Sequence, residues 1–409
     1  MELTLKDLVH TGPGTIAGRY MRSFWQPVMR SEDLKAGTAQ PLRIMGEDFT
    51  IYRGTTGGAH VVAPRCAHRL TRLHMGWVDG DNIQCLYHGW QFDHTGQCVY
   101  QPGEREAFTR GTRVAAYPTT EYLGLIWAYF GEGDAPPMRR YPDFERLGVL
   151  SISLPEIWPC NYFNRLDNGP DLFHVLFTHK ETLTREGAIA PKGIDGGGAV
   201  PEVKFAETAF GIETTLKGMG SGTSYFHFLM PNTNVISAHT GRVEGYRDGS
   251  RYWRAEMFIR VPIDDENSIS FPIVLVDAHG EDAARYLSQR DKARTELNPA
   301  RLIQDNAEAV MAGHMRISDM DRRMSAYYSF LVEDYACQVG QGAIADREHE
   351  RLGQIDQGTV LLRKLWLREL TAFAEGRPVK QWAVPTGLAD KTEPQPSYAR
   401  ASAAAAHAT

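Results

Sequence analysis

The first 150 residues contain short apolar runs that are separated by clusters of turn-forming residues. One such run covers Phe49–Tyr52 and another covers Leu123–Phe130. Gly, Asp, Asn and Thr gather between the runs, at residues 55–58, 79–82 and 93–96. Short apolar runs bounded by turn residues are typical of β-strands. We therefore expect the N-terminal part of the chain to be mostly β.

A breaker-rich segment at residues 131–137 separates this part from longer segments of mixed character. Apolar residues recur at helical spacing over residues 359–373 and predict an amphipathic helix there, namely Leu362, Trp366, Leu370 and Phe373. The remaining predicted segments are strands at residues 224–229, 252–261 and 268–276, a helix at residues 281–297 and a mobile loop at residues 189–200. The pattern predicts one domain at residues 1–140, a second at residues 141–378, and a flexible tail at residues 379–409.

Composition excludes several classes of protein. The chain has 409 residues, of which 42% are hydrophobic and 23% are charged, as in a globular protein of two or three domains. Its net charge of −6 gives no electrostatic support for nucleic-acid binding. No apolar stretch approaches the length of about 18 residues that a membrane helix needs, and the N-terminus lacks a signal-peptide pattern. Because five cysteines cannot build a disulfide scaffold here, we expect a cytoplasmic protein. The charge and the short apolar stretches also lead us to expect that it binds neither nucleic acid nor membrane.

Two Cys-His pairs form the first candidate site. One residue separates Cys66 from His68, two residues separate Cys85 from His88, and sixteen residues lie between the pairs. A Rieske-type [2Fe-2S] cluster needs two thiolates on one iron and two imidazoles on the other, and each pair offers one of each. The pattern could instead arise by chance or hold a structural zinc ion. Zinc fingers pair Cys with Cys and His with His, so the mixed pairs favour the cluster.

The second candidate site is at residues 168–179, where Asp171 is followed by His174 and His179. Two imidazoles and one carboxylate on one face of an iron leave positions open for O₂ and substrate, as in the facial triad of non-haem oxygenases. Residues five apart on an ideal α-helix differ in direction by about 140°. Both histidines can therefore bind one iron only if the helix bends or forms a π-type turn between them. The alternative is that they are ordinary helix residues.

Around both sites the sequence resembles the Rieske non-haem iron aromatic ring-hydroxylating oxygenases. The segments CAHRL and CLYHGWQFDHTG are similar to their Rieske domain, and N-x2-D-x2-H-x4-H is similar to their iron-site motif. The opening GRYMRSFWQPV and the late segment ERLGQIDQGTVLLRKL are similar to the phthalate-dioxygenase type of this family. Two features depart from the family: Leu70 and Thr71 replace small residues, and His74 lies inside the first loop.

The resemblance implies an α+β fold. An N-terminal all-β Rieske [2Fe-2S] domain would precede a C-terminal catalytic domain, whose antiparallel sheet is flanked by helices in a helix-grip-like arrangement. The implied cluster ligands are Cys66, His68, Cys85 and His88.

The resemblance also implies a mononuclear Fe(II) held by His174, His179 and a carboxylate on a late helix. Spacing alone does not identify that carboxylate. Asp334 precedes a helical-looking segment at residues 335–340 and stands at the position that resembles the family's ligand. The competing carboxylates are Glu333, Asp319 and Asp321.

Two further residues receive roles from the resemblance. Asp171 matches the family's bridging aspartate, which implies hydrogen bonds to His174 and to the ring of His88 in a neighbouring chain. Asn168 is expected near the same iron. The ordinary alternatives are an acidic residue at a helix N-terminus for Asp171 and a helix cap for Asn168.

The implied activity is the incorporation of O₂ into an aromatic carboxylate. The family implies an iron–sulfur flavoprotein reductase that passes electrons from NADH to the cluster, and a homotrimer or stacked trimers of the oxygenase chain. The length and opening of the chain resemble those of an oxygenase that cleaves phenoxybenzoate. That reaction is an angular dioxygenation that gives protocatechuate and a phenol.

Several alternatives remain open at this point. The same two centres could support O-demethylation or monooxygenation of another aromatic acid, and a Rieske-type electron-transfer protein or a zinc-stabilised interaction module would explain less of the chain. An aromatic acid needs an apolar pocket with one cation. Possible walls are Phe226, Phe228, Tyr252, Trp253 and Phe258, and possible cations are Arg242, Arg254 and Arg260. Such residues are more often plain core or surface, and the sequence does not choose among them.

Overall fold

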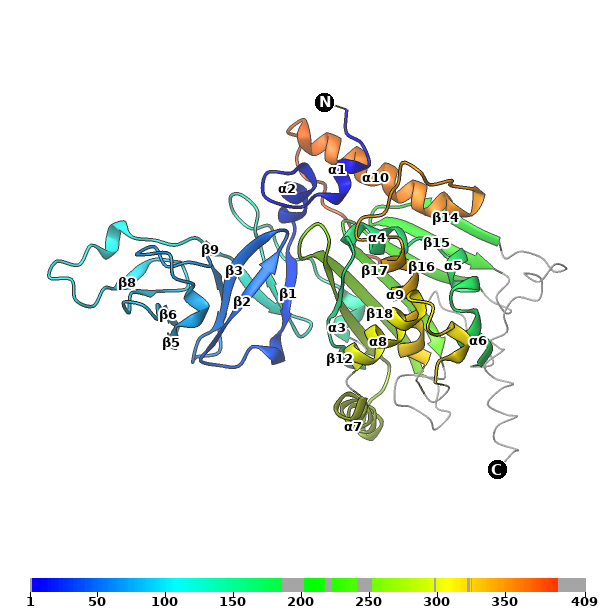
Figure 1. Cartoon of the computed structure of the whole chain (residues 1–409), viewed down its shortest axis with the longest axis horizontal. Helices are drawn as coiled ribbons and strands as arrows, with labels where there is room; N and C mark the ends of the chain where they lie inside the picture. Colours follow the sequence, from blue (N-terminus) through cyan, green and yellow to red (C-terminus); the bar gives the residue numbers. More distant parts are fainter. Residues whose placement is uncertain are drawn as a thin grey trace.

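Two groups of β-sheets, joined through a shared core, make up the chain (Figure 1). The computed structural model describes residues 2–146, 148–185, 202–217, 223–240, 252–297, 299–321, 324 and 326–388. The predicted loop at residues 189–200 and the last part of the predicted tail, residues 389–409, lie outside the described residues.

The N-terminal part has two short helices and three small antiparallel sheets, as the mostly β pattern predicted. The helices are α1 (Lys6–Val9) and α2 (Ile16–Arg22), and the strands are β1 (Gln26–Arg30), β2 (Thr38–Ile44), β3 (Glu47–Arg53), β4 (Ala59–Val62), β5 (Trp77–Asp79), β6 (Asn82–Gln84), β7 (Gln91–Phe92), β8 (Cys98–Tyr100), β9 (Ala116–Tyr117), β10 (Thr119–Tyr122) and β11 (Leu125–Ala128). The strand orders are β2-β3-β4-β9, β5-β6-β7-β8 and β1-β11-β10. The second of these sheets carries the loops with the Cys-His pairs.

The C-terminal part is one antiparallel sheet of eight strands with helices around it, so the expected α+β fold is confirmed. The strands run in the order β12-β19-β18-β17-β16-β15-β14, and β13 also pairs with β19. They are β12 (Val149–Ile152), β13 (Glu156–Trp158), β14 (Glu202–Glu207), β15 (Gly211–Lys217), β16 (Thr223–Leu229), β17 (Thr233–Thr240), β18 (Tyr252–Pro262) and β19 (Ser268–Val276). The helices are α3 (Pro142–Arg146), α4 (Tyr162–Asp167), α5 (Phe173–Phe177), α6 (Lys180–Arg185), α7 (Gly280–Leu297), α8 (Pro299–Met311), α9 (Ala326–Gly340) and α10 (Gln357–Ala374).

Strand β18 has two unlike faces. Ala255, Met257 and Ile259 are at most 1% exposed and belong to the main hydrophobic core. The alternate residues Phe258 and Arg260 point to the other face, because successive side chains of a strand point to opposite sides. The segment after α4 lies against this second face: a Cβ on Gly169 would come within 2.3 Å of the Asn234 amide, and Asn234 pairs with Phe258. One sheet face thus holds the core, and the other faces the helices of the candidate iron site.

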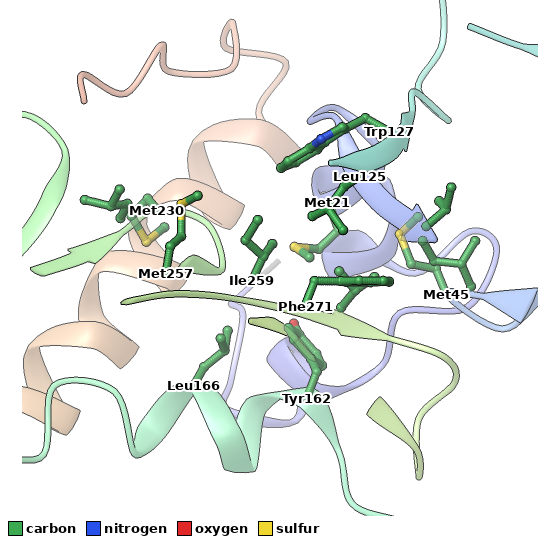
Figure 2. Close-up of a cluster of buried hydrophobic side chains, with 14 of the residues drawn as sticks. Met21, Met45, Leu125, Trp127, Tyr162, Leu166, Met230, Met257, Ile259 and Phe271 are labelled. Carbon is green, nitrogen blue, oxygen red and sulfur yellow. The ribbon is translucent and has the colours of Figure 1, made fainter. Parts of the chain in front are cut away.

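The main hydrophobic core crosses the boundary between the two parts. Figure 2 shows Met21 and Trp127 of the N-terminal part beside Met257, Ile259 and Phe271 of β18 and β19. The main-chain N–H of Met45 also donates to the carbonyl of Pro262, at 2.8 Å. Because the apolar face of β18 is buried by both parts, their relative position is fixed by packing.

Helix α10 confirms the predicted helical spacing. Leu362, Trp366 and Leu370 are fully buried, and the ring of Trp366 lies 5.4 Å from that of Tyr20 and 5.6 Å from that of Phe163. The helix therefore joins the N-terminal helix α2 to helix α4, which leads into the candidate iron site.

The prediction of a flexible tail is wrong for the first ten residues of that segment. In residues 379–388, Trp382 and Leu388 are 7% and 2% exposed and belong to the main core. Apolar burial holds this segment although its Pro and Gly residues prevent regular structure.

None of the described helices is long and apolar enough to cross a membrane.

The packing of α10 gives a stability prediction. Trp366→Ala should lower the free energy of unfolding by about 3–5 kcal/mol, because a fully buried aromatic ring leaves a cavity among aromatic neighbours. Leu352→Ala, at a position 46% exposed, is the matched control and should change it by less than about 0.5 kcal/mol. Chemical denaturation followed by circular dichroism measures both. Equal midpoints for the two variants would contradict the packing described here.

Candidate metal centres

The two Cys-His pairs lie on two loops of like construction. In the first loop the N–H of Leu70 donates to the carbonyl of Cys66 at 3.0 Å, and in the second the N–H of Gly89 donates to the carbonyl of Cys85 at 3.0 Å. Leu70 and Gly89 both have positive φ, 61° and 72°. Glycine adopts this conformation freely, whereas leucine is strained there. Leu70, which replaces a small residue of the family, thus stands at a position where the backbone conformation favours glycine.

The two loops bring thiols and imidazoles to one place. Cys66 and Cys85 are 1% and 2% exposed, while His68 and His88 are exposed, with ring centroids 4.6 Å apart. The ring of Trp90 stacks on His68 at 4.4 Å and fixes its plane. Burial raises the pKa of the Cys66 thiol to about 12. Two buried thiols beside two exposed imidazoles fit the donor set of a Rieske cluster.

The helix after Asp171 is interrupted between the two histidines. Helix α5 ends at Phe177 and α6 begins at Lys180, so His179 lies in the turn that separates them. The carbonyl of His174 accepts from the N–H of Thr178 at 2.7 Å at the end of α5, and the carbonyl of His179 accepts from the N–H of Leu183 at 2.8 Å at the start of α6. The predicted bend is confirmed.

The interruption brings three donor atoms together. The Nε2 atoms of His174 and His179 each lie 3.7 Å from Oδ1 of Asp334, and all three atoms are within 4.8 Å of one another. Asp334 lies on α9, and its Oδ1 atom is buried without a hydrogen-bond partner. A buried carboxylate oxygen without a donor is costly unless a cation binds it. Two imidazoles and this carboxylate therefore fit a mononuclear iron.

Hydrogen bonds at the opposite ring nitrogens fix both imidazoles. Nδ1 of His174 lies 2.5 Å from the main-chain carbonyl of Asp171, and Nδ1 of His179 lies 2.8 Å from Oε2 of Glu333. Glu333 is 1% exposed and also accepts from the hydroxyl of Thr182 at 2.8 Å. Such bonds place the proton on Nδ1 and leave Nε2 free to bind a metal.

The two imidazoles differ in electrostatic surroundings. Burial lowers the pKa of His174, and the neighbouring His179 lowers it further. Burial also opposes protonation of His179, but the carboxylates of Asp334 and Glu333 outweigh it and raise the pKa of His179.

Asp171 and Asn168 lie at the site in ways that the sequence only partly predicted. The bond of Asp171 to His174 is made by the main-chain carbonyl; the side-chain Oδ2 is 3.8 Å from Nδ1. The side-chain Oδ1 instead accepts from the N–H groups of Phe173 and His174, at 3.0 and 3.3 Å. It thus caps helix α5, because the first N–H groups of a helix lack partners in the helix. Asn168 Nδ2 lies 3.5 Å from Nε2 of His174.

The structure separates the competing carboxylates. Glu333 is turned away from the three donor atoms toward Nδ1 of His179, and Asp319 accepts the N–H of Arg316 in a short exposed turn. Neither these two nor Asp321 belongs to the described group of donor atoms.

Sequence reasoning missed two supporting residues. Glu333 was considered only as a rival ligand. Its position next to Asp334 was the available signal, because neighbouring residues on a helix point in different directions and so cannot both face the metal. Trp90, which follows the second Cys-His pair by two residues, was not connected with His68. An aromatic residue beside a metal motif was the available signal.

Glu333 gives a prediction for iron binding. Glu333→Ala should weaken the affinity of the mononuclear site for Fe(II) by about 10–100-fold, because His179 loses the acceptor that orients it. Titration of iron-depleted protein with Fe(II) measures this, and the visible absorption of the [2Fe-2S] cluster should not change. Asp319→Asn, at an exposed acidic residue, is the control. Unchanged Fe(II) affinity in Glu333→Ala would contradict the assigned role.

Known proteins resemble this chain in sequence and in fold. Residues 24–118 match the model of the Rieske [2Fe-2S] domain. The chain is 27% identical over 388 residues to the 5,5'-dehydrodivanillate O-demethylase oxygenase subunit of Sphingobium sp., covering 91% of this chain and 81% of that protein. It is 26% identical to the phthalate 4,5-dioxygenase oxygenase subunit of Pseudomonas putida, covering 88% and 83%.

A shorter match and a solved structure complete the comparison. The chain is 35% identical over 184 residues to the phenoxybenzoate dioxygenase subunit alpha of Ectopseudomonas oleovorans, covering 41% of this chain and 44% of that protein. NdmA of Pseudomonas putida CBB5, solved as a QL mutant with caffeine, has the same fold with a TM-score of 0.62 at 21% identity, covering 87% of this chain and 93% of that one. The matched domain and the long relatives together support a Rieske oxygenase of the phthalate-dioxygenase type, and the solved structure shares the fold of this chain.

Proposed function

We propose that this chain is the terminal oxygenase of a multicomponent Rieske system that incorporates O₂ into an aromatic carboxylate. The observation that carries the proposal is the convergence of His174 Nε2, His179 Nε2 and Asp334 Oδ1 within 4.8 Å of one another. Such a triad leaves coordination positions open on one side, which a purely structural metal site does not need. The relatives named for phthalate and phenoxybenzoate support an aromatic acid as the substrate.

The chain's own residues would divide the work between two centres. Cys66, His68, Cys85 and His88 would hold the [2Fe-2S] cluster, and His174, His179 and Asp334 would hold Fe(II). When bound, the cluster supplies one-electron transfer and the Fe(II) supplies the activation of O₂.

Neighbouring groups prepare these ligands. The carbonyl of Asp171 and the carboxylate of Glu333 hold the two imidazoles with Nε2 inward. Asn168 adds an amide beside His174, where it would limit the positions open to a bound molecule. Orientation before binding is the protein's main contribution to such a site, because the metal carries the redox chemistry.

The specific reaction that we propose is ether cleavage of phenoxybenzoate. One O₂ adds two oxygen atoms across the ether-bearing carbon and its neighbour, while NADH supplies two electrons and one proton is taken up. The hemiacetal so formed loses its carbon–oxygen ether bond and gives protocatechuate and a phenol. An iron–sulfur flavoprotein reductase would carry the electrons from NADH to this chain.

O-demethylation or monooxygenation of another aromatic acid is the second candidate. It is favoured by the O-demethylase relative, which matches 91% of this chain, whereas the phenoxybenzoate dioxygenase relative matches 41%. A Rieske-type electron-transfer protein, the remaining alternative, would have no use for the second group of donor atoms.

We also propose that two neighbouring chains complete each active unit. In Figure 1 the sheet of β5 and β6, which carries the cluster loops, lies at one end of the chain, while α5 and α9 lie in the other part. Apolar side chains are exposed at the cluster end, with Leu70, Trp77 and Phe108 at 62%, 54% and 54%. Exposed apolar patches of this kind mark contacts with other proteins. His88 of one chain would then meet Asp171 of the next in a homotrimer or stacked trimers.

Product analysis tests the proposed reaction. Purified protein, a matching reductase, NADH and O₂ are incubated with 3-phenoxybenzoate or with 4-methoxybenzoate. We expect equal amounts of protocatechuate and phenol from 3-phenoxybenzoate. Formaldehyde from 4-methoxybenzoate without cleavage of 3-phenoxybenzoate would support the second candidate, and no O₂ uptake with any aromatic acid would contradict the oxygenase function.

Mixing of variants tests the pairing of chains. His88→Ala and His174→Ala should each abolish turnover, because each removes a ligand of a different centre. Co-expressed chains that form mixed oligomers should regain part of the activity, since some interfaces join an intact cluster end to an intact iron site. Native mass spectrometry verifies that mixed oligomers form. Mixed oligomers without activity would contradict the pairing.

A further inference from the structure

Five buried polar side chains gather beside the candidate iron site, and neither metal centre uses them. We call them the inner polar cluster, and it consists of Glu156 on β13, Arg165 on α4, Arg260 on β18, Ser270 on β19 and Gln338 on α9. All five are at most 9% exposed. Ser270 pairs with Glu156 on one side and with Arg260 on the other, so these three side chains point to the same sheet face. Gln338 lies one helical turn after Asp334, on the same side of α9.

Each member of the inner polar cluster has a buried polar atom without a hydrogen-bond partner. These atoms are Glu156 Oε1, Arg165 Nε, Arg260 Nε and Nη1, Ser270 Oγ, and Gln338 Oε1 and Nε2. Proteins satisfy the great majority of their buried polar groups, and each exception needs an explanation. So many exceptions at one place indicate that a polar group from outside the chain completes their hydrogen bonds.

The charges in the inner polar cluster do not balance. Glu156 binds Arg165, with Oε2 at 2.6 Å from Nη2 and its main-chain carbonyl at 3.1 Å from Nη1. Arg260 makes no ion pair with any residue that the structure describes. Burial and the nearby Arg165 lower the pKa of Arg260 to about 10, so its guanidinium is still charged at neutral pH. The carboxylates of Glu156 and Asp334 act on Arg260 from a distance, but neither forms an ion pair with it. Because buried charges are normally paired, Arg260 lacks a directly bonded anion.

We propose that Arg260, with the hydroxyl of Ser270, binds the carboxylate of the aromatic substrate. A guanidinium offers parallel N–H donors that match a carboxylate, and one negative charge balances the cluster. This assignment rests on the proposed function and selects among the three arginines that the sequence left open. Arg242 and the side chain of Arg254 lie outside the described residues.

The surroundings of Arg260 suit the rest of such a substrate. The charge of Asp334 acts on Arg260, so the carboxylate would be held near the iron ligand. A cavity of about 260 Å³ adjoins the inner polar cluster at Glu156, and Trp158, Leu331 and Tyr335 line it. Leu331 and Tyr335 lie beside Asp334 on α9. These apolar side chains offer walls for an aromatic ring at the Glu156 end of the inner polar cluster.

Binding measurements on the oxidised protein, without reductase, test the assignment. Calorimetric titration compares 3-phenoxybenzoate and 4-methoxybenzoate with the corresponding uncharged carboxamides. We expect at least one acid to bind at least tenfold more tightly than its amide. Arg260→Gln should remove that preference, Arg260→Lys should keep part of it, and Arg377→Gln, at an exposed arginine after α10, should leave it unchanged.

The results that overturn the assignment are equally direct. Wild-type protein that binds neither acid, or binds acid and amide equally, overturns it, as does Arg260→Gln that still prefers the acid. If Arg260→Gln does not fold, the wild-type comparison and Ser270→Ala decide, and in Ser270→Ala the acid should bind severalfold more weakly. These binding measurements involve no turnover. An acid that binds through Arg260 but gives no product in the product analysis would therefore contradict the proposed function and not the carboxylate site.

Discussion

The site depends on one geometric constraint: three donor atoms from two separate helical segments must face one point. His174 and His179 are five residues apart, a spacing that an uninterrupted α-helix would direct to different sides. The chain meets the constraint by ending α5 at Phe177 and starting α6 at Lys180. The histidines then converge on Asp334, which arrives from α9 more than 150 residues later in the sequence. A local break in one helix is thus what makes a metal site out of distant segments.

The rest of the C-terminal part supports this arrangement through the two faces of its sheet. The apolar face of β18 joins the main core with Met21 and Trp127, so the sheet cannot shift relative to the N-terminal part. The opposite face carries Arg260 and Ser270 toward α4 and α9. Period-two alternation therefore places stability on one side of a strand and binding chemistry on the other.

Much of this could be predicted from the sequence, and what could not has physical reasons. Cysteines and histidines at short spacing report local chemistry, so both motifs and the helix break were readable. Spacing alone could not separate Asp334 from Glu333, because adjacent helix residues differ only in the direction of their side chains, and only the family resemblance favoured Asp334. The main-chain bond from Asp171 to His174 was missed because sequence patterns describe side chains. The packed segment around Trp382 was missed because composition does not reveal tertiary burial.

The division of the chain into two metal centres is tested most directly by iron content. The intact protein should contain three irons per chain, two in the [2Fe-2S] cluster and one at the triad. The double variant His174→Ala/His179→Ala should contain two, with unchanged visible absorption of the cluster and no substrate-dependent O₂ uptake. A double variant that keeps three irons, or one that loses the third iron and still oxidises substrate, would contradict the account.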